Sequence, residues 1–289
     1  MNPATENSHR FTALNPSLLS RREISLLGRI GALEVRRAIS RREIAAAQAL
    51  RYKVFVEEMG AVLPAAAMRA RRDCDHVDSY CDHLLVIDTG IEGAVEDQIV
   101  GTYRLLRQDV AARHAGFYSQ SEYDVAAMMR RQPGKRFMEL GRSCVLPAYR
   151  TRRTIELLWQ GNWAYALAHG IDAMFGCASF PGARPHAHAL ALSFLYHNAA
   201  AEGIWDVKPI DGLGVGMDMM PPEAIMPRAA INTMPPLIKG YLRLGARTSR
   251  AAVADVAFNT TDILVVLPVG EINPRYVNHY GSDAGRFAA

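Results

Sequence analysis

The stretch RFMELGRSCVLPAYR, residues 136–150, places two charged side chains inside an apolar, strand-like run. A carboxylate can act as a general base, a guanidinium can hold an anion, and unpaired backbone N–H groups can bind a developing oxyanion. In a regular strand Glu139 and Arg142 point to opposite faces. Gly141 between them permits a β-bulge, which changes the register and brings both to one side. The alternative is a structural salt bridge at a sheet edge.

An arginine and an aromatic residue share one face of a predicted helix over residues 40–60. Ser40 followed three residues later by a glutamate predicts the helix start, and a glycine at position 60 predicts its end. Arg51 falls inside the apolar arc, four residues before Phe55. A buried arginine needs an anionic partner, although the side chain can alternatively extend along its stem to solvent.

Two aspartates precede a predicted buried strand at residues 84–87, and an arginine lies within the next predicted strand, residues 99–106. We expect the two strands to pair in antiparallel fashion. By the alternation of the strand, Arg104 falls on the same face as neighbours that point inward, so it too needs an anion. Asp75 and Asp78 are candidate partners.

The remaining pattern predicts an α/β fold with a mixed sheet, because strands and helices alternate along the chain. A segment rich in Pro, Gly and Met is predicted to be a long functional loop, whose methionines either line an apolar groove or pack in the core. The expected elements are a strand at 30–38, a strand at 136–146, a helix at 152–169, a strand at 171–179, a helix from Pro185 toward Gly203, the loop at 205–236 and strand-like runs over 241–268.

Composition is typical of a globular chain, with 289 residues, 49% of them hydrophobic and 21% charged. No apolar run is long enough for a membrane-spanning helix, and no secretory signal is expected. The four cysteines show no metal-like spacing, so we expect free thiols and no metal site. The net charge of +4 is carried mainly by arginine, and no nucleic-acid motif accompanies it. Residues 1–25 are expected to form a flexible tail.

In order and spacing, these motifs together resemble the acyl-homoserine lactone synthases of the GNAT superfamily. They are more similar still to the L-ornithine N-alpha-acyltransferases that start ornithine lipid synthesis, often labelled hemolysin-like. The resemblance covers about residues 40–268. It is carried by RYKVFVEEMG (51–60), DHVDSYCDHLLV (75–86), VGTYRLL (100–106), FMELGRSCV with YRTRRTIELLWQG (137–161), GYLRLGA (240–246) and FNTTD (258–262).

The resemblance implies a GNAT-like acyl-CoA N-acyltransferase fold, whose central, mostly antiparallel mixed sheet is flanked by helices. It implies a single such domain over residues 26–289, with the loop at 205–236 as an insertion. The implied reaction moves a 3-hydroxyacyl chain from acyl carrier protein to the alpha-amine of L-ornithine, which is the first step of ornithine lipid synthesis. No bound cofactor is expected, since the acyl-pantetheine thioester is a co-substrate.

One segment departs from the wider superfamily, in which a glycine-rich turn cradles the pyrophosphate of acetyl-CoA. The equivalent residues here, 150–155, contain no glycine. A helix N-terminus flanked by Arg150, Arg152 and Arg153 suits the single phosphate of a pantetheine arm and an acidic protein surface. This favours acyl carrier protein over acetyl-CoA as the donor.

Within that reaction, Glu139 is the expected base, acting directly or through a water molecule. The distal ammonium of ornithine needs an anionic partner, and Asp75 and Asp78 are the candidates. The carboxylate of ornithine needs a cation. Arg104 or Arg142 can serve it, or can instead pair with Asp78 and hold the site together.

Two further side chains are expected at the acceptor site. Arg51 is expected to pair with one of the acids, and Phe55 to form part of the pocket wall. Two other functions remain open. One is an acyl-homoserine lactone-type or other N-acyl amino acid synthase, although the long 205–246 segment disfavours the lactone synthases. The other is a non-catalytic module that binds an acidic partner. We expect a cytoplasmic protein whose membrane contact, if any, is peripheral at the inner face.

Overall fold

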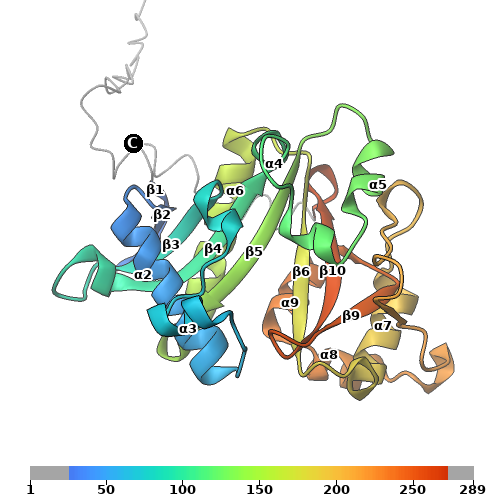
Figure 1. Cartoon of the computed structure of the whole chain (residues 1–289). Helices are drawn as coiled ribbons and strands as arrows, with labels where there is room; N and C mark the ends of the chain where they lie inside the picture. The colour runs from blue at the N-terminus through green and yellow to red at the C-terminus, as the bar shows by residue number, and fades with distance from the viewer. Residues whose placement is uncertain (1–25, 273–289) are drawn as a thin grey trace, which may run out of the picture.

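The computed structural model describes residues 26–272, which form a sheet of ten strands with helices on both faces (Figure 1). The predicted tail, residues 1–25, lies outside the described residues. The strands run in the order β1-β2-β3-β4-β5-β6-β10-β9-β7, and β8 pairs with β10. Their bounds are β1 Leu26–Ile30, β2 Leu33–Arg37, β3 Asp82–Asp88, β4 Ile99–Arg107, β5 Phe137–Val145, β6 Ala173–Pro181, β7 Gly214–Gly216, β8 Arg247–Thr248, β9 Ala251–Asp255 and β10 Thr260–Pro268.

The helices cover the two faces because the strands alternate buried side chains between them. Leu85 of β3 packs under α2, whereas its neighbour Leu84 packs in the cluster that contains α6. We call the side that carries α2 and α5 the α2 face, and the side that carries α6, α7 and α9 the opposite face. The bounds are α2 Arg41–Tyr52, α3 Ala65–Ala70, α4 Gln108–Ala111, α5 Val125–Arg130, α6 Arg152–Ala168, α7 Ala189–Ala199, α8 Pro227–Thr233 and α9 Pro236–Leu244.

Strands β5 and β6 form the only parallel pair in the described sheet, and they separate after three residues. The pairing ends at Glu139 opposite Phe175. Beyond that point β5 continues against β4 alone, β6 continues against β10, and the two strands diverge (Figure 1). Gly176 stands where they part, since a Cβ there would lie 2.1 Å from the carbonyl oxygen of Leu140. The facing edges of the separated strands therefore leave backbone groups without a strand partner.

The β-bulge predicted in the ELGR segment is confirmed. The register between β4 and β5 shifts between Thr102 and Arg104, so that one extra residue of β5 is accommodated. The unusual backbone conformation falls on Arg142, with φ of 51°, and not on Gly141. The extra residue rotates Arg142 toward the face on which Glu139 lies, as the partners of both side chains show below.

Three expected elements differ from the structure. The single strand at 30–38 is a hairpin of β1 and β2, because Gly31 takes a positive φ of 62° and turns the chain. The strand-like run that begins at residue 241 starts inside helix α9, which Pro236 opens and Gly245 ends. The segment 205–236, expected to be a loop, contains short β7 and α8, and two of its methionines, Met217 and Met234, are buried in the core.

Helix α2 begins as predicted, with the Ser40 side chain accepting a hydrogen bond from the N–H of Glu43. The Glu43 carboxylate accepts from the N–H of Ile39 and pairs with buried Arg36. Among residues 26–272, no helix combines the length and the apolar character needed to cross a bilayer.

Candidate functional site

A buried arginine on α2 forms the centre of an ion-pair network on the α2 face. Arg51 is fully buried and donates from Nε to Asp73 at 2.8 Å and from Nη2 to Asp78 at 2.7 Å. Burial raises the pKa of the Asp78 carboxyl, but the hydrogen bond and charge of Arg51, with the charge of Arg104, hold that pKa well below its ordinary value. The expectation that Arg51 pairs with a nearby acid, and does not extend to solvent, is confirmed.

Two further arginines close the same network from strands β4 and β5. Arg104 donates to Asp75 at 2.7 Å and lies 3.5 Å from Asp78. Arg142 lies 3.2 Å from Asp73 and 3.3 Å from Asp75. We name this set of three arginines and three aspartates the arginine–aspartate network: Arg51, Arg104, Arg142, Asp73, Asp75 and Asp78.

The network has equal numbers of positive and negative side chains, and each aspartate already faces arginine. Asp75 and Asp78 also cap the 3₁₀ turn His76–Ser79 by exchanging side-chain and backbone hydrogen bonds. The structure therefore does not leave these two carboxylates open for a substrate ammonium, because their charge is already compensated. Asp73 was not among the predicted site residues, although its place two residues before Asp75 was a signal for it.

Arg142 extends from the bulge between two aromatic rings. Its guanidinium carbon lies 4.3 Å from the centroids of both Tyr118 and Phe258. Phe258 belongs to the turn between β9 and β10, and it packs edge to face on Phe55 of the turn after α2, at 5.9 Å. The structure thus brings the predicted Phe55 to the rim of the site, and it adds Tyr118 and Phe258.

Glu139 is the last residue of β5 that pairs with β6, and its side chain, which lies on the α2 face, belongs to a residue that is 4% exposed. Its Oε2 accepts from the backbone N–H of Tyr118 at 2.9 Å. Its Oε1 accepts from the N–H of Ser119 at 2.7 Å and from the Ser119 hydroxyl. A carboxylate offers about four acceptor positions, so three donors leave room for one more. The carboxylate is fixed in place and retains one position for a ligand.

The three arginines at the start of α6 have different environments. Arg150 is bound by Glu58 through two hydrogen bonds of 2.5 and 2.6 Å. Arg152 pairs with Glu156 one turn along the helix at 2.6 Å. Arg153 is exposed and forms no ion pair with any residue between 26 and 272. The predicted cluster is therefore one open cation beside two cations that have carboxylate partners.

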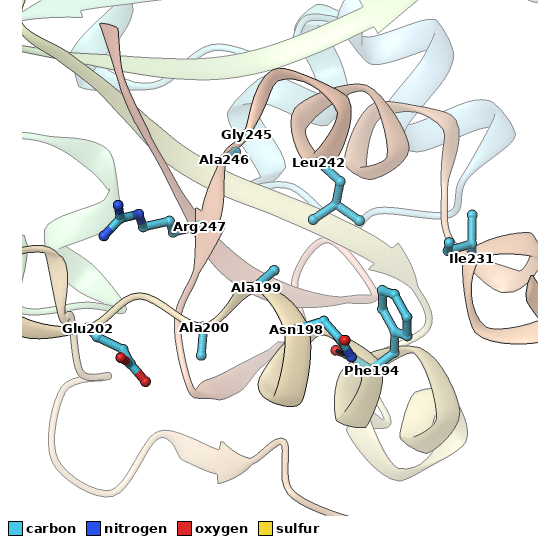
Figure 2. Close-up of a pocket in the computed structure, with 10 residues that line it drawn as sticks. All are labelled: Phe194, Asn198, Ala199, Ala200, Glu202, Ile231, Leu242, Gly245, Ala246 and Arg247. Atoms are coloured by element: carbon cyan, nitrogen blue, oxygen red, sulfur yellow. Dashed lines mark hydrogen bonds between the residues drawn. The ribbon is translucent and has the colours of Figure 1, made fainter. Parts of the chain in front are cut away.

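A pocket of about 550 Å³ opens on the opposite side of the sheet from Glu139, between α7, α8 and α9 (Figure 2). The side chains of Phe194, Ile231 and Leu242 face its interior, whereas Arg247 is directed away. Its lining holds no residue of the arginine–aspartate network and no predicted site residue. The pocket is therefore separate from the site built on β5.

Asp78, Cys81 and His83 place one donor atom each within 4.8 Å of one another. Asp78 is committed to arginine, and burial raises the pKa of the Cys81 thiol far above its ordinary value. A protonated thiol and a paired carboxylate are poor metal ligands.

Comparison with known proteins places these features in a family context. Residues 50–160 match the family model described as acetyltransferase (GNAT) domain. The L-ornithine N(alpha)-acyltransferase of Rhizobium meliloti (strain 1021) is 64% identical over 91% of this chain and 89% of its own length. The protein of the same name from Agrobacterium fabrum is 64% identical over 90% of this chain and 89% of its own length. The one from Rhodobacter capsulatus is 40% identical over 86% of this chain and 94% of its own length.

Solved structures with a similar fold are more distant in sequence. FeeM, an N-acyl amino acid synthase from uncultured soil microbes, aligns with a TM-score of 0.48 and 13% identity, over 87% of this chain and 94% of that chain. BjaI, a CoA-dependent acyl-homoserine lactone synthase, aligns with a TM-score of 0.45 and 13% identity, over 84% and 82%.

Proposed function

This chain belongs to the L-ornithine N(alpha)-acyltransferases, and from that premise we propose that it acylates the alpha-amine of L-ornithine. The acyl group in this proposal is a 3-hydroxyacyl chain delivered by acyl carrier protein, and the product is lyso-ornithine lipid. The GNAT unit is proposed to form a single domain from residue 26 onward. The protein is proposed to act in the cytoplasm, with peripheral contact at the inner membrane face.

The observation that carries the proposal is the position of Glu139 at the point where β5 and β6 separate. A thioester carbonyl held between the two strands would find unpaired backbone N–H groups on their facing edges. A carboxylate on the adjoining face can then receive the proton of the attacking amine. These are the two groups that amide formation from a thioester requires.

In the proposed reaction, the alpha-amine loses a proton to Glu139, directly or through a water molecule at its remaining acceptor position. The amine nitrogen attacks the thioester carbon, and the negative charge passes to the carbonyl oxygen. Collapse forms the amide and breaks the C–S bond, and the thiol of the carrier takes up a proton. An alpha-amine has a pKa of about 8 and a distal amine about 10.4, so the alpha-amine is more easily deprotonated near neutral pH.

The start of α6 supports acyl carrier protein as the donor. The absence of glycine at residues 150–155 leaves side chains where a pyrophosphate would approach. Arg153 offers an exposed cation beside the N-terminus of a 17-residue helix. This combination suits one phosphate and an acidic carrier surface.

The test is product detection by mass spectrometry. Purified protein is supplied with the same 3-hydroxyacyl chain on acyl carrier protein or on coenzyme A, together with ornithine, lysine or homoserine-type acceptors. The expected result is an ornithine amide formed from the carrier-bound donor. A faster reaction from the coenzyme A thioester would overturn the proposed donor, and a different preferred acceptor would overturn the proposed substrate.

A further inference from the structure

The arginine–aspartate network leaves the distal ammonium of the acceptor without a partner, since Asp75 and Asp78 are already engaged. A second set of carboxylates lies on the same face of the sheet, beyond β5. Glu122 follows the turn that holds Glu139, and Asp262 lies on β10. One carboxylate oxygen of each residue and the sulfur of Cys177 all lie within 4.8 Å of one another. We name these two acids the Glu122–Asp262 pair.

Both members of the pair are buried, Glu122 at 8% exposure and Asp262 at 5%. Oδ1 of Asp262 makes no hydrogen bond with any described residue, and the carboxylate lies beside the hydroxyls of Thr260 and Ser179. The thiol of Cys177 donates to Oε2 of Glu122 at 3.5 Å. Burial, together with Asp262 and Asp255, raises the pKa of Glu122, and burial with Asp255 raises that of Asp262.

No cation of the described chain neutralises the pair. Arg142 is the arginine that influences both carboxyls, but its ion pairs within 4 Å are with Asp73 and Asp75. No Lys, Arg or His nitrogen of residues 26–272 lies within 4 Å of either acid. Buried carboxyls are ordinarily paired with a cation or kept protonated, so a ligand that brings a cation would meet two acids here that have no ion-pair partner among the described residues.

The geometry suits an ammonium group. A nitrogen placed between two oxygens that are up to 4.8 Å apart can lie about 2.9 Å from both, which is the usual hydrogen-bond distance. A metal ion is less suited, because burial and the two neighbouring acids raise the pKa of the Cys177 thiol and keep its proton.

The distance from Glu139 also suits ornithine. Glu139 pairs with Phe175, and Cys177, which donates to Glu122, is two residues further along the same face of β6. Two residues of a strand span about 6–7 Å. The two amines of extended ornithine are separated by about 6 Å, since its bonds are near 1.5 Å long. The alpha-amine can therefore lie at Glu139 while the distal ammonium lies at the pair.

We propose that the Glu122–Asp262 pair binds the distal ammonium of the amino-acid acceptor and thereby selects ornithine over amino acids with apolar side chains. This inference rests on the proposed function, since it assigns the acceptor specificity of that same site.

The experiment compares acceptors in the full-length enzyme with 3-hydroxyacyl carrier protein as donor. L-Norvaline has the carbon chain of ornithine without the distal amine, and L-lysine is one methylene longer. The variants are Asp262→Asn and Glu122→Gln. The matched control is Glu202→Gln, an exposed carboxylate that pairs with Arg250. The readouts are kcat and KM for each acceptor.

The wild type is expected to favour ornithine over norvaline by about 100-fold in kcat/KM. Norvaline lacks the distal ammonium, so the two buried acids remain without a partner when it binds. Asp262→Asn and Glu122→Gln are expected to raise the KM for ornithine about 10-fold or more, with little change for norvaline. An unchanged preference, or equal losses for both acceptors, would overturn the inference while leaving the acyltransferase function in place.

A binding measurement separates this inference from the proposed function. Ornithine is expected to raise the Tm of the acyl-free wild type more than norvaline does, and Asp262→Asn is expected to abolish the difference. If the wild type acylates no amino acid but shows this Asp262-dependent shift, the cation site stands and the reaction does not. A shift with Zn²⁺ or Mn²⁺ and none with ornithine would overturn the ammonium site.

Discussion

Glu139 accepts hydrogen bonds from both the backbone N–H and the hydroxyl of Ser119, a residue 20 positions earlier in the chain. The contact joins strand β5 to the 3₁₀ turn Tyr118–Ser121. It fixes the carboxylate and also sets the positions of Tyr118, against Arg142, and of Glu122, at the end of the turn. The same turn therefore positions the proposed base, Glu139, and one member of the Glu122–Asp262 pair, Glu122.

Glu139→Gln is expected to lower kcat by about 100-fold or more, because the amide cannot accept the amine proton. Ser119→Ala removes one of three donors and leaves the carboxylate in place. It is expected to cost about 10-fold or less and to act on KM as well as kcat. Steady-state kinetics with ornithine check both variants, and Glu156→Gln, a surface carboxylate paired with Arg152, is the control. Full activity in folded Glu139→Gln would remove Glu139 from its role.

Arg51→Met is expected to lower the free energy of unfolding by about 3–5 kcal/mol, because it leaves Asp73 and Asp78 buried with one cation fewer. Urea denaturation at pH 7 measures the change. Arg113→Met is the control, since its pair with Asp109 is exposed and is expected to contribute about 1 kcal/mol at most. Adding Asp78→Asn to Arg51→Met should recover part of the loss. A double variant less stable than the single would contradict the pairing.

The lowered pKa of Asp78 predicts an acid-dependent loss of stability. An ordinary aspartate has a pKa of about 3.9, so between that value and the lower folded value the unfolded chain binds more protons. The stabilisation is present above about pH 4 and is lost as the pH falls below it. Denaturation between pH 7 and pH 3 should therefore show a smaller slope for Asp78→Asn than for the wild type. Asp75 and Glu43 also have lowered pKa values and contribute to the remaining slope.

Sequence patterns were sufficient to predict a structural feature where that feature depends on residues close together in the chain. Gly141 indicated the bulge, and the inward position of Arg51 on its helix indicated a buried ion pair. The partner of each arginine could not be assigned, because the turn at His76–Ser79 brings three similar aspartates within reach. Helix α9 was missed because its apolar residues and Gly240 read equally well as a strand.

No local pattern indicated the Glu122–Asp262 pair, although Asp262 ends the FNTTD motif at residues 258–262. Its members are 140 positions apart in sequence, and neither belongs to a patterned motif of charged residues. They meet because β10, besides pairing with β9, also pairs with β6, which is distant in sequence, and this places Asp262 opposite Ser179. Only the strand order could reveal a site of this kind.

The start of α6 provides a test of donor recognition. Arg153→Glu is expected to raise the KM for the acyl carrier protein about 10-fold and to leave the KM for ornithine unchanged, because the open cation is proposed to face the donor. Arg150→Gln is expected to have a smaller effect, since Glu58 already binds this arginine. Arg243→Glu, at an exposed position of α9, is the matched charge reversal. Similar KM values for all three variants would contradict a docking role for this helix end.

The raised pKa of Glu122 predicts a pH dependence opposite to that of Asp78. The folded carboxyl holds its proton above the ordinary glutamate value of about 4.3, so the folded state binds more protons than the unfolded chain in this range. The free energy of unfolding of the ligand-free protein should therefore fall as the pH rises from about 4.3 through neutrality. Glu122→Gln removes this fall in the free energy of unfolding. Each unit by which folding raises the pKa of the carboxyl corresponds to about 1.4 kcal/mol.

Denaturation at pH 5 and at pH 8 is the measurement, with Glu202→Gln as the control because its carboxylate is exposed. Glu122→Gln should exceed the wild type in stability by about 1 kcal/mol or more at pH 8, and by less at pH 5. Saturating ornithine should reduce the wild-type slope, because a bound ammonium favours the ionised pair. Parallel curves for wild type and Glu122→Gln would show that the carboxyl titrates normally, and the pair would then have no electrostatic need for a ligand cation.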